Sequence, residues 1–218
     1  MTAKMDVKTN PGGNFNLIAP VYDVLAFVVF GRKLQQAQGH FLSTIPPKAS
    51  VLLVGGGTGW LLEQVLIRCQ TERVLYLETS SRMVARATRR MTDKSLLGMV
   101  EFRVGDETSL RSGEQFDVVI TPFLLDLFSE HTLQSRLIPS LLSVLKSGGM
   151  WLVTDFVAPP AWWQKILLWA MIRFFRLIAG IETRKLANWQ QSLSDAGLVL
   201  QARKPQVGGM VSAEVWGQ

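Results

Sequence analysis

The stretch Val51-Leu52-Leu53-Val54-Gly55-Gly56-Gly57-Thr58-Gly59 predicts a strand, a tight turn and the start of a helix. Its first four residues are apolar and typical of a buried strand. Four of the next five are glycines, which let the backbone turn sharply and let a ligand approach main-chain atoms. Residues 60–67 then have helix-compatible sequence. A strand, a glycine turn and a helix in this order indicate a nucleotide-binding corner.

The sequence on the C-terminal side of this corner alternates between strand-like and helix-like segments. We expect strands at 50–54, 73–77, 100–104, 116–121 and 149–156, and helices at 59–69, 81–91 and 131–145. Pro139 is expected to start or kink the last of these helices. This alternation predicts an α/β fold with a doubly wound, mostly parallel sheet covered on both faces. Residues 199–203 and 209–216 are expected to add an antiparallel pair, giving seven strands.

The length of 218 residues is consistent with a single domain over residues 1–218. Within it we expect a helical N-terminal segment at 15–45, ending at Pro46-Pro47, and a cofactor-binding core at 50–156. A helical lid or insertion is expected at 157–192, with a long helix over 161–181 and a second near 186–196. The closing strands occupy 197–216.

Composition narrows the class of protein. Hydrophobic residues make up 48% and charged residues 18%, which suits a folded core rather than a disordered chain. The net charge of +6 favours an anionic partner, but the basic residues are scattered except at 86–90, where we expect a solvated helix face. Cys69 is the only cysteine, which excludes an intrachain disulfide and a cysteine-based metal cluster, and we expect no metal site.

The cellular location is predicted from the position and length of the apolar segments. Residues 1–16 are polar and lack the apolar segment of a signal peptide. The longest apolar runs, 24–30 and 166–172, are far shorter than the ~20 residues that cross a bilayer. We therefore expect a cytoplasmic protein, with peripheral membrane contact as an alternative.

The residues at the strand ends indicate which nucleotide binds, because ligands of open α/β sheets lie at the carboxyl ends of the strands. Glu78 follows the second strand, about 20 residues past the turn, where a carboxylate accepts hydrogen bonds from ribose hydroxyls. Asp106 follows the third strand and could accept from an adenine amine. Glu78 alone could equally be a surface carboxylate, but the joint register of Gly55, Glu78 and Asp106 indicates a site. Trp60 stands where a dinucleotide-binding turn has its third glycine, which disfavours NAD.

At these positions the sequence resembles the class I S-adenosylmethionine-dependent methyltransferases, over about residues 50–156. Val51 to Gly59 resembles the family's first motif, Leu77-Glu78-x-Ser80-x-x-Met83 its ribose-binding motif, and Gly105-Asp106 its adenine-side motif. Leu142 to Phe156, with Lys146-Ser147-Gly148-Gly149, resembles the turn into strand five. Phe15-Asn16-x-Ile18-Ala19-Pro20-x-Tyr22-Asp23 is similar to the N-terminal segment of the quinone-biosynthesis branch, within the small-molecule methyltransferases.

The resemblance implies a Rossmann-like methyltransferase fold and S-adenosylmethionine as cofactor. The residues expected to bind the cofactor are Gly55, Gly56, Gly57, Glu78, Thr79, Met83, Asp106, Glu107 and Thr121. One departure is Leu53, where the family usually carries an acidic residue that orders the loop around the aminoacyl end of the cofactor. Main-chain carbonyls near Gly55 and Gly57 could still accept from the ammonium group.

The implied reaction is in-line displacement of a methyl group from a sulfonium, for which proximity and desolvation are the protein's main tasks. A general base is needed only if the acceptor must lose a proton. Candidates near strand ends are Tyr22, Asp126, His131 and Asp155. His131 also fits a structural place near a helix start after Ser129, and Asp155 could instead face solvent. His40 is expected to be structural.

Residues that could line an acceptor pocket are Phe15, Tyr22, Phe123, Trp162 and Trp163. Trp162 and Trp163 lie in an apolar, Trp-rich segment, residues 162–181. This segment has three interpretations: a core helix over the sheet, a lid over a lipophilic acceptor, or a basic amphipathic helix on a membrane surface. Lys165, Arg173 and Arg176 share one face of that helix.

The leading hypothesis is a methyltransferase acting on a small, hydrophobic acceptor. A nucleic-acid acceptor is disfavoured because Thr121-Pro122-Phe123-Leu124 lacks an amine-methylating motif and no basic–aromatic tract is present. One alternative is a non-catalytic methyltransferase-fold protein that docks through its 162–181 helix. This alternative stays open because Leu53 replaces the acidic residue that the family usually carries. A nucleotide-dependent oxidoreductase comes third. The sequence predicts no oligomeric state.

Overall fold

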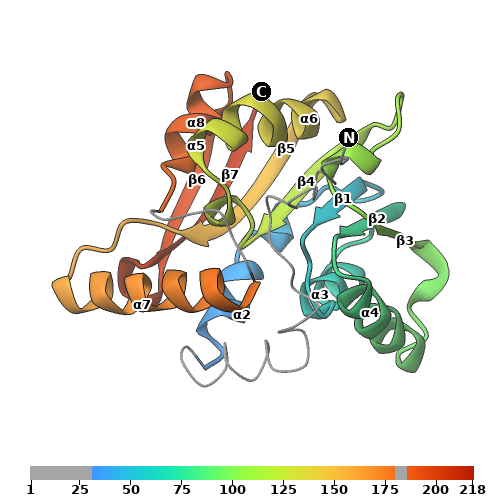
Figure 1. Cartoon of the computed structure of the whole chain (residues 1–218). Coiled ribbons are helices and arrows are strands. Elements are labelled where there is room, and N and C mark those ends of the chain that lie inside the picture. The colour runs from blue at the N-terminus through green and yellow to red at the C-terminus, as the bar shows by residue number, and fades with distance from the viewer. Residues whose placement is uncertain (1–30, 180–185) are drawn as a thin grey trace, which may run out of the picture.

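The computed structural model describes residues 31–179 and 186–218, without the side chains of residues 171, 172 and 174–179 (Figure 1). Its centre is a seven-stranded sheet in the order β3-β2-β1-β4-β5-β7-β6. The strands are β1 Ser50–Val54, β2 Arg73–Glu78, β3 Val100–Val104, β4 Phe116–Pro122, β5 Leu145–Phe156, β6 Val199–Gln206 and β7 Val211–Gly217. β1 to β5 pair in parallel, and β7 is antiparallel to both β5 and β6. The predicted doubly wound, mostly parallel sheet with a closing antiparallel pair is confirmed.

Helices cover both faces of the sheet, as the parallel crossovers require (Figure 1). The α-helices are α2 Lys33–Gln38, α3 Trp60–Arg68, α4 Ser81–Asp93, α5 Glu130–Thr132, α6 Ile138–Ser143, α7 Trp162–Ala179 and α8 Trp189–Asp195. A π-helical segment, η5 Leu133–Leu137, joins α5 to α6. Short 3-10 turns are η1 Leu42–Thr44, η2 Leu97–Met99, η3 Glu107–Ser109, η4 Leu125–Leu127 and η6 Val207–Gly209.

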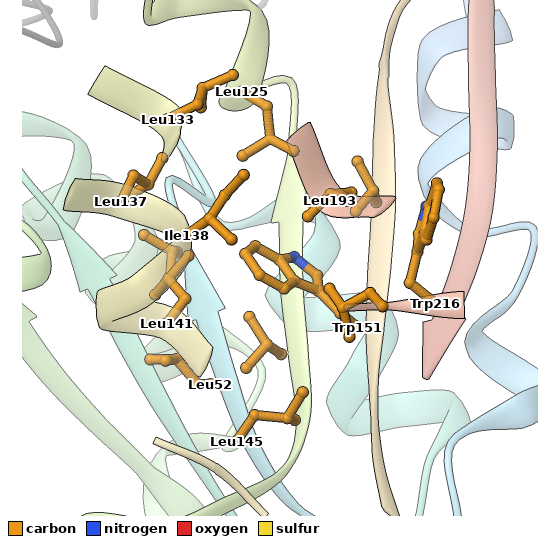
Figure 2. Packing of buried hydrophobic residues seen from close by; sticks show 14 of the residues in the cluster. Leu52, Leu125, Leu133, Leu137, Ile138, Leu141, Leu145, Trp151, Leu193 and Trp216 are labelled. Atoms are coloured by element: carbon orange, nitrogen blue, oxygen red, sulfur yellow. The ribbon is translucent and has the colours of Figure 1, made fainter. Parts of the chain in front are cut away.

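Two hydrophobic cores lie on opposite faces of the sheet. Leu52 of β1 and Trp151 of β5 pack with the α5–α6 segment and α8 on one face (Figure 2). Leu53 of β1 packs with α3 and α4 on the other face. Successive residues of β1 therefore enter different cores, which explains why this strand is apolar without alternation. Cys69 is buried and free, within the second core.

The turn predicted before strand five is a bulge inside β5. Phe116 of β4 pairs with Leu145, and Val118 pairs with Met150, so residues 146–149 lie opposite one residue of β4. That residue, Asp117, accepts from the Lys146 ammonium group at 2.8 Å. The preceding helix is also shorter than predicted: it ends at Ser143, and Pro139 lies in the first turn of α6.

Several described elements fall within the segments expected around the core. α2 and η1 fall within the predicted 15–45 segment, of which residues 15–30 lie outside the description. α7 corresponds to the predicted helix over 161–181, of which 180 and 181 are not described. α8 begins at Trp189, because the Asn188 side chain accepts from the backbone N–H of Gln191 and caps the helix there. Among the described residues, no helix has the length and apolarity to cross a bilayer.

Candidate functional site

The glycine turn between β1 and α3 has a backbone that only glycine accommodates easily. Gly55, Gly57 and Gly59 have φ angles of +72°, +61° and +85°. A Cβ at Gly59 would lie 2.8 Å from Cβ of Ala87, so this glycine brings α3 close to α4. A Cβ at Gly57 would meet nothing within 4 Å, because that position faces open space. The turn therefore presents backbone to a cavity, as a ligand cradle requires.

Glu78 ends β2 directly beside this turn. Its carboxylate accepts from the Gly57 N–H at 3.2 Å through one oxygen and from the Ser80 N–H at 3.0 Å through the other. Burial raises the pKa of Glu78, and these backbone hydrogen bonds oppose the rise. The Thr79 hydroxyl also donates to Glu78, at 3.4 Å. Two carboxylate oxygens offer about four acceptor positions, so Glu78 retains about one for a hydroxyl group in the cavity.

Tyr76, which sequence reasoning missed, supports the same turn. Its hydroxyl donates to the Gly57 carbonyl at 2.5 Å. The backbone carbonyl of Gly57 thus accepts from Tyr76, and its backbone N–H donates to Glu78. Leu53, where an acidic residue was expected from the resemblance, is fully buried in the core against α3. The sequence did contain a signal for Tyr76, because it is the one residue with a polar group among the aliphatic residues in the centre of β2.

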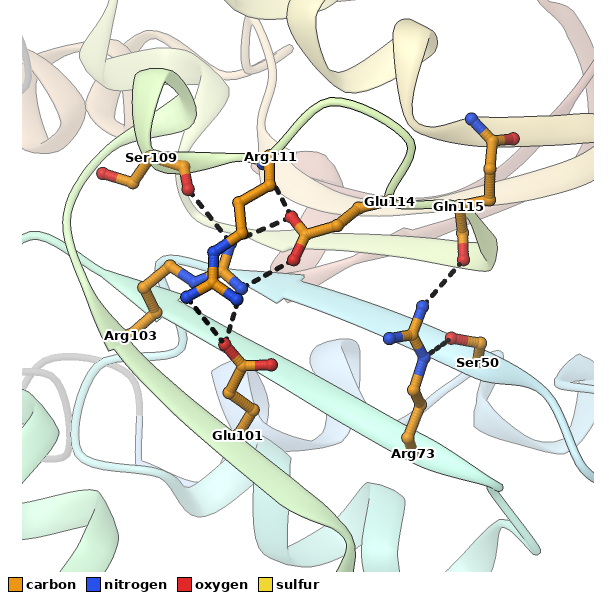
Figure 3. A network of polar contacts seen from close by, with 8 residues as sticks. All are labelled: Ser50, Arg73, Glu101, Arg103, Ser109, Arg111, Glu114 and Gln115. Atoms are coloured by element: carbon orange, nitrogen blue, oxygen red, sulfur yellow. Dashed lines mark hydrogen bonds and ion pairs between the residues drawn. The ribbon is translucent and has the colours of Figure 1, made fainter.

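Asp106 follows β3 on a loop that an ion-pair network fixes. The Asp106 carboxylate caps η3 by accepting from the Thr108 N–H at 3.0 Å. Behind it, Arg103 of β3 donates to both oxygens of Glu114, at 2.9 and 2.6 Å, and to the Ser109 carbonyl at 3.0 Å (Figure 3). The hydrogen bonds from Arg103 lower the pKa of Glu114 to about 2. The network ties both ends of the loop together and so positions Asp106 at the sheet edge.

A cavity at the carboxyl edge of β1, β2, β3 and β4 brings these elements together. The predicted residues that line it are Gly55, Gly56, Gly57, Glu78, Thr79, Met83, Asp106, Glu107 and Phe123. Thr121 does not line it: the residue is buried, and its hydroxyl accepts from the Trp151 indole at 2.9 Å. Trp162 and Trp163 do not line it either, since both are exposed on α7. These two tryptophans are therefore not pocket residues in this structure.

Several lining residues had no signal in the sequence. They are Leu34, Gln35 and Gln38 of α2, Trp60 and Leu61 of α3, Leu124, Leu127 and Phe128 after β4, and Arg136 and Leu137 of η5. Trp60, which disfavoured a dinucleotide, thus borders the cavity itself. Arg136 forms an ion pair with the buried Glu107 carboxylate at 2.5 Å, which places a paired charge in the cavity wall.

The loop after β4 is held by Asp155, and the alternative that Asp155 faces solvent is wrong. Asp155 is 0% exposed. One of its oxygens accepts from the backbone N–H groups of Leu124, Leu125 and Asp126, at 3.1, 2.7 and 3.3 Å. Phe123, at the start of the loop, has a φ of +50° and packs against Phe156. Asp155 therefore shapes one wall of the cavity without lining it.

The half-buried Asp126 and the fully buried Asp155 form a carboxyl pair. Each interacts with the other through a side-chain hydrogen bond. Burial raises the pKa of Asp126 to about 6. Burial and the neighbouring Asp126 raise the pKa of Asp155 well above its usual value. Two carboxylates this close cannot both ionise cheaply, so the pair shares protons and titrates as a unit.

None of the remaining catalytic candidates within the described residues lines the cavity. Asp126 is beside the cavity wall but does not line it. His131 is exposed on α5, where Ser129 caps the helix. His40 packs edge-on against Phe41. Tyr22 and Phe15 fall outside the described residues. No cluster of three metal-ligating side chains occurs within the described parts of the chain.

Comparison with known families identifies the core. The sequence profile of the family described as "Methyltransferase domain" matches residues 51–149. That span runs from β1 into β5 and contains the glycine turn, Glu78 and Asp106. No curated protein matches the chain significantly.

Solved structures share the fold across most of the chain. One is a chain of the complex between the Haloferax volcanii Trm112 methyltransferase activator and a putative methyltransferase, with TM-score 0.69 and 16% identity over 94% of this chain and 97% of that one. Another is N-methyltransferase NodS from Bradyrhizobium japonicum WM9 with S-adenosyl-l-homocysteine, with TM-score 0.64 and 17% identity over 87% of each chain. Magnesium protoporphyrin IX methyltransferase from Synechocystis PCC 6803, with bound SAH, has TM-score 0.63 and 17% identity over 85% of this chain and 81% of that one. At these identities the likeness establishes the fold.

Proposed function

Residues 51–149 are a methyltransferase domain of the class I, S-adenosylmethionine-dependent family, and from this premise we propose that the protein methylates a small, hydrophobic acceptor. The observation that carries the proposal is the composition of the cavity. Part of the lining is the glycine turn with Glu78 and Asp106, and another part is apolar, made of Leu34 of α2 and the side chains of the loop after β4. The first part suits the cofactor, and the second suits an apolar acceptor.

The residues of the first part fit S-adenosylmethionine. Glu78 lines the cavity and has acceptor capacity left for a ribose hydroxyl, and the Asp106 carboxylate, which also lines the cavity, would accept from the adenine amine. Gly57 lets the cofactor approach the turn because no side chain fills the space there. The aminoacyl end would interact with main-chain groups of the turn, since Leu53 contributes only packing.

The chemistry supplied by bound S-adenosylmethionine is an activated methyl group on a sulfonium. The protein's part is to hold the acceptor in line with that methyl group and to exclude water. Leu34, Phe123 and Leu127 are placed to do both, because they form an apolar wall of the cavity. No lysine or histidine lines this cavity among the described residues, which favours acceptors that need no strong protein base.

A small-molecule acceptor also agrees with the names of two solved structures that share the fold. The names of NodS and the magnesium protoporphyrin IX enzyme describe methyltransferases, and the latter acts on a porphyrin. We extend to this chain only the general class of small molecule. Protein-based or nucleic-acid acceptors would need an open, charged surface beside the methyl site, whereas Phe123, Leu124 and Phe128 are apolar.

Cofactor binding is tested by isothermal titration with S-adenosylmethionine and, for comparison, NAD. Glu78→Gln should weaken S-adenosylmethionine binding by about tenfold or more, because charged hydrogen bonds to the ribose contribute roughly 1.5–3 kcal/mol. Glu72→Gln, which removes an exposed carboxylate next to β2, is the matched control and should bind normally. Binding of NAD but not S-adenosylmethionine would refute the proposal.

Catalysis is tested separately with cofactor carrying a labelled methyl group. The label should enter material that partitions into organic solvent when the protein is incubated with a lipid-soluble extract. Transfer only into protein or RNA would contradict a small, hydrophobic acceptor. Tight cofactor binding without transfer into any fraction would favour the non-catalytic alternative.

A further inference from the structure

Helix α7 has an inner face that docks on the body of the protein. The Gln164 amide donates to the Gly208 carbonyl at 3.1 Å, and its oxygen accepts from the Ala161 N–H at 3.2 Å. One turn later, Leu168 is buried against Phe156, Met210 and Val211. These contacts fix the rotation of the first half of α7 about its own axis, so its opposite face must point outward.

The outward face is apolar and rich in tryptophan. Trp162, Trp163, Ile166 and Trp169 are 73%, 53%, 57% and 59% exposed. At 100° per residue they fall within about 120° of arc, so they form one continuous surface rather than scattered side chains. We call these four residues the tryptophan face. A contiguous apolar surface of this kind on a helix marks a docking site.

Cations border the tryptophan face. Lys165 and Arg173 are both exposed, and the Arg173 guanidinium lies 5.0 Å from the centre of the Trp169 ring. Residues 157–179 contain no aspartate or glutamate, so no carboxylate on this helix opposes an anionic partner. Tryptophan with flanking lysine and arginine is the side-chain combination favoured at the interface of a bilayer with anionic headgroups.

The inner face of α7 is connected to the cavity wall. Leu167 and Leu168 pack in the same hydrophobic cluster as Leu34 and Phe123, which line the cavity. The tryptophan face is thus separated from the apolar side of the cavity by a single helix. In Figure 1 α7 extends along one end of the molecule, beside α2.

We propose that the tryptophan face of α7, with Lys165 and Arg173, binds the surface of a bilayer that contains anionic phospholipid. The indole rings insert at the headgroup level, and the two cations pair with lipid phosphates. The helix lies in the membrane plane, with its inner face still docked on the sheet. This proposal is independent of the proposed function, because binding to lipid needs neither cofactor nor acceptor.

Flotation of the full chain with vesicles tests the proposal. The protein should float with vesicles of phosphatidylglycerol mixed with phosphatidylcholine, and binding should weaken as salt is raised. Trp162→Ser combined with Trp169→Ser should weaken partitioning by about tenfold or more, because it removes the inserted area. Lys165→Gln combined with Arg173→Gln should weaken it by about 30-fold, from about fivefold per charge.

Matched controls change the same properties elsewhere. Ile67→Ser with Met99→Ser removes two exposed apolar side chains, and Arg86→Gln with Arg89→Gln removes two exposed cations from α4. Both pairs should float like the unmodified protein. Equal loss in the control and α7 pairs, or no flotation of the unmodified protein, would overturn the proposal.

A second measurement separates lipid from protein partners. Light scattering of the unmodified protein and the tryptophan variant gives their masses in solution. If the tryptophan substitutions convert an oligomer into a monomer, the face is an interface between copies and the membrane proposal is wrong. Equal mass for the two, with flotation lost only in the variant, supports it.

Discussion

Asp126→Asn should make the protein more stable at neutral pH while leaving its stability at mildly acidic pH nearly unchanged. The substitution keeps the shape of the side chain, and an amide can both donate and accept, so the hydrogen bond to the Asp155 side chain is preserved. The substitution removes the ability of residue 126 to ionise, because asparagine has no titratable side chain. Asp126 is suited to this test because it is beside the cavity wall but does not line it.

The magnitude follows from the pKa of Asp126. Its rise from 3.8 to about 6 corresponds to about 3 kcal/mol between the two protonation states. Because the folded-state pKa is raised, this stabilisation is fully present below the unfolded-state pKa and is lost as pH rises through the folded-state pKa. About 2 kcal/mol of that loss falls between about pH 4.5 and 7.5. Asp126→Asn should not show this part of the loss.

Urea unfolding of both proteins at those two pH values measures the effect. The variant minus wild-type difference in the free energy of unfolding should grow by about 2 kcal/mol from the lower to the higher pH. Groups outside the pair cancel in this difference: Glu78, whose raised pKa acts in the same direction, and Glu114, whose lowered pKa acts below the window, are present in both proteins. Asp155 does not cancel, because the Asp126 carboxylate is one cause of its raised pKa. Removing that cause makes the difference grow in the same direction, so about 2 kcal/mol is a lower bound.

A constant difference across the pH range would refute the reasoning. It would mean that Asp126 has the same affinity for protons in the folded and unfolded states. A difference that shrinks toward neutral pH would show that Asp126 is stabilised as a carboxylate, opposite in sign to the effect of burial.

Three further substitutions probe the glycine turn. Tyr76→Phe removes the hydroxyl that donates to Gly57 and should weaken S-adenosylmethionine binding about 3- to 10-fold in calorimetry; unchanged affinity would show that the bond does not order the turn. Gly59→Ala places a Cβ 2.8 Å from the Cβ of Ala87, at a backbone φ of +85°. Urea unfolding should show a free energy of unfolding lower by about 2 kcal/mol or more. An unchanged midpoint would mean that α3 and α4 separate freely. Leu53→Asp introduces the acidic residue that the family usually carries, but it buries an unpaired carboxylate. The free energy of unfolding should fall by about 3 kcal/mol or more, with no gain in cofactor affinity. Tighter cofactor binding by a stable variant would contradict the packing role of Leu53.

The fold class was predictable because strand–helix alternation indicates a parallel sheet that is covered on both faces. Glu78 and Asp106 could be placed beside the glycine turn for the same reason, since parallel strands end at one edge of the sheet. The family resemblance predicted a turn at residues 146–149, where the structure has a bulge. No local pattern predicts that β4 and β5 pair on both sides of it, with Asp117 of β4 accepting from Lys146 inside the bulge.

The rest of the cavity depends on contacts between distant parts of the chain. Leu124 and Leu127 line it because Asp155, about 30 residues away along the chain, fixes the backbone of their loop. Trp162 and Trp163 of α7 were expected in the pocket only because the segment is apolar and rich in tryptophan. Their actual direction is set by Gln164 and Leu168, which choose the buried face of the helix. Helical periodicity predicts that opposite faces differ, but not which one docks.

The placement of β7 between β5 and β6 has a consequence for the order in which the sheet can be completed during synthesis. β6 leaves the ribosome before β7, yet each of its hydrogen-bonded partners in the sheet belongs to β7. Until residues 211–217 emerge, β6 has no template, and residues 150–156 of β5 present an unpaired apolar edge. Such an edge recruits strands from other chains. A nascent or truncated chain that stops before β7 is therefore the form most prone to aggregate, and a chaperone that shields β5 should matter more for this protein than one that assists β1 to β4.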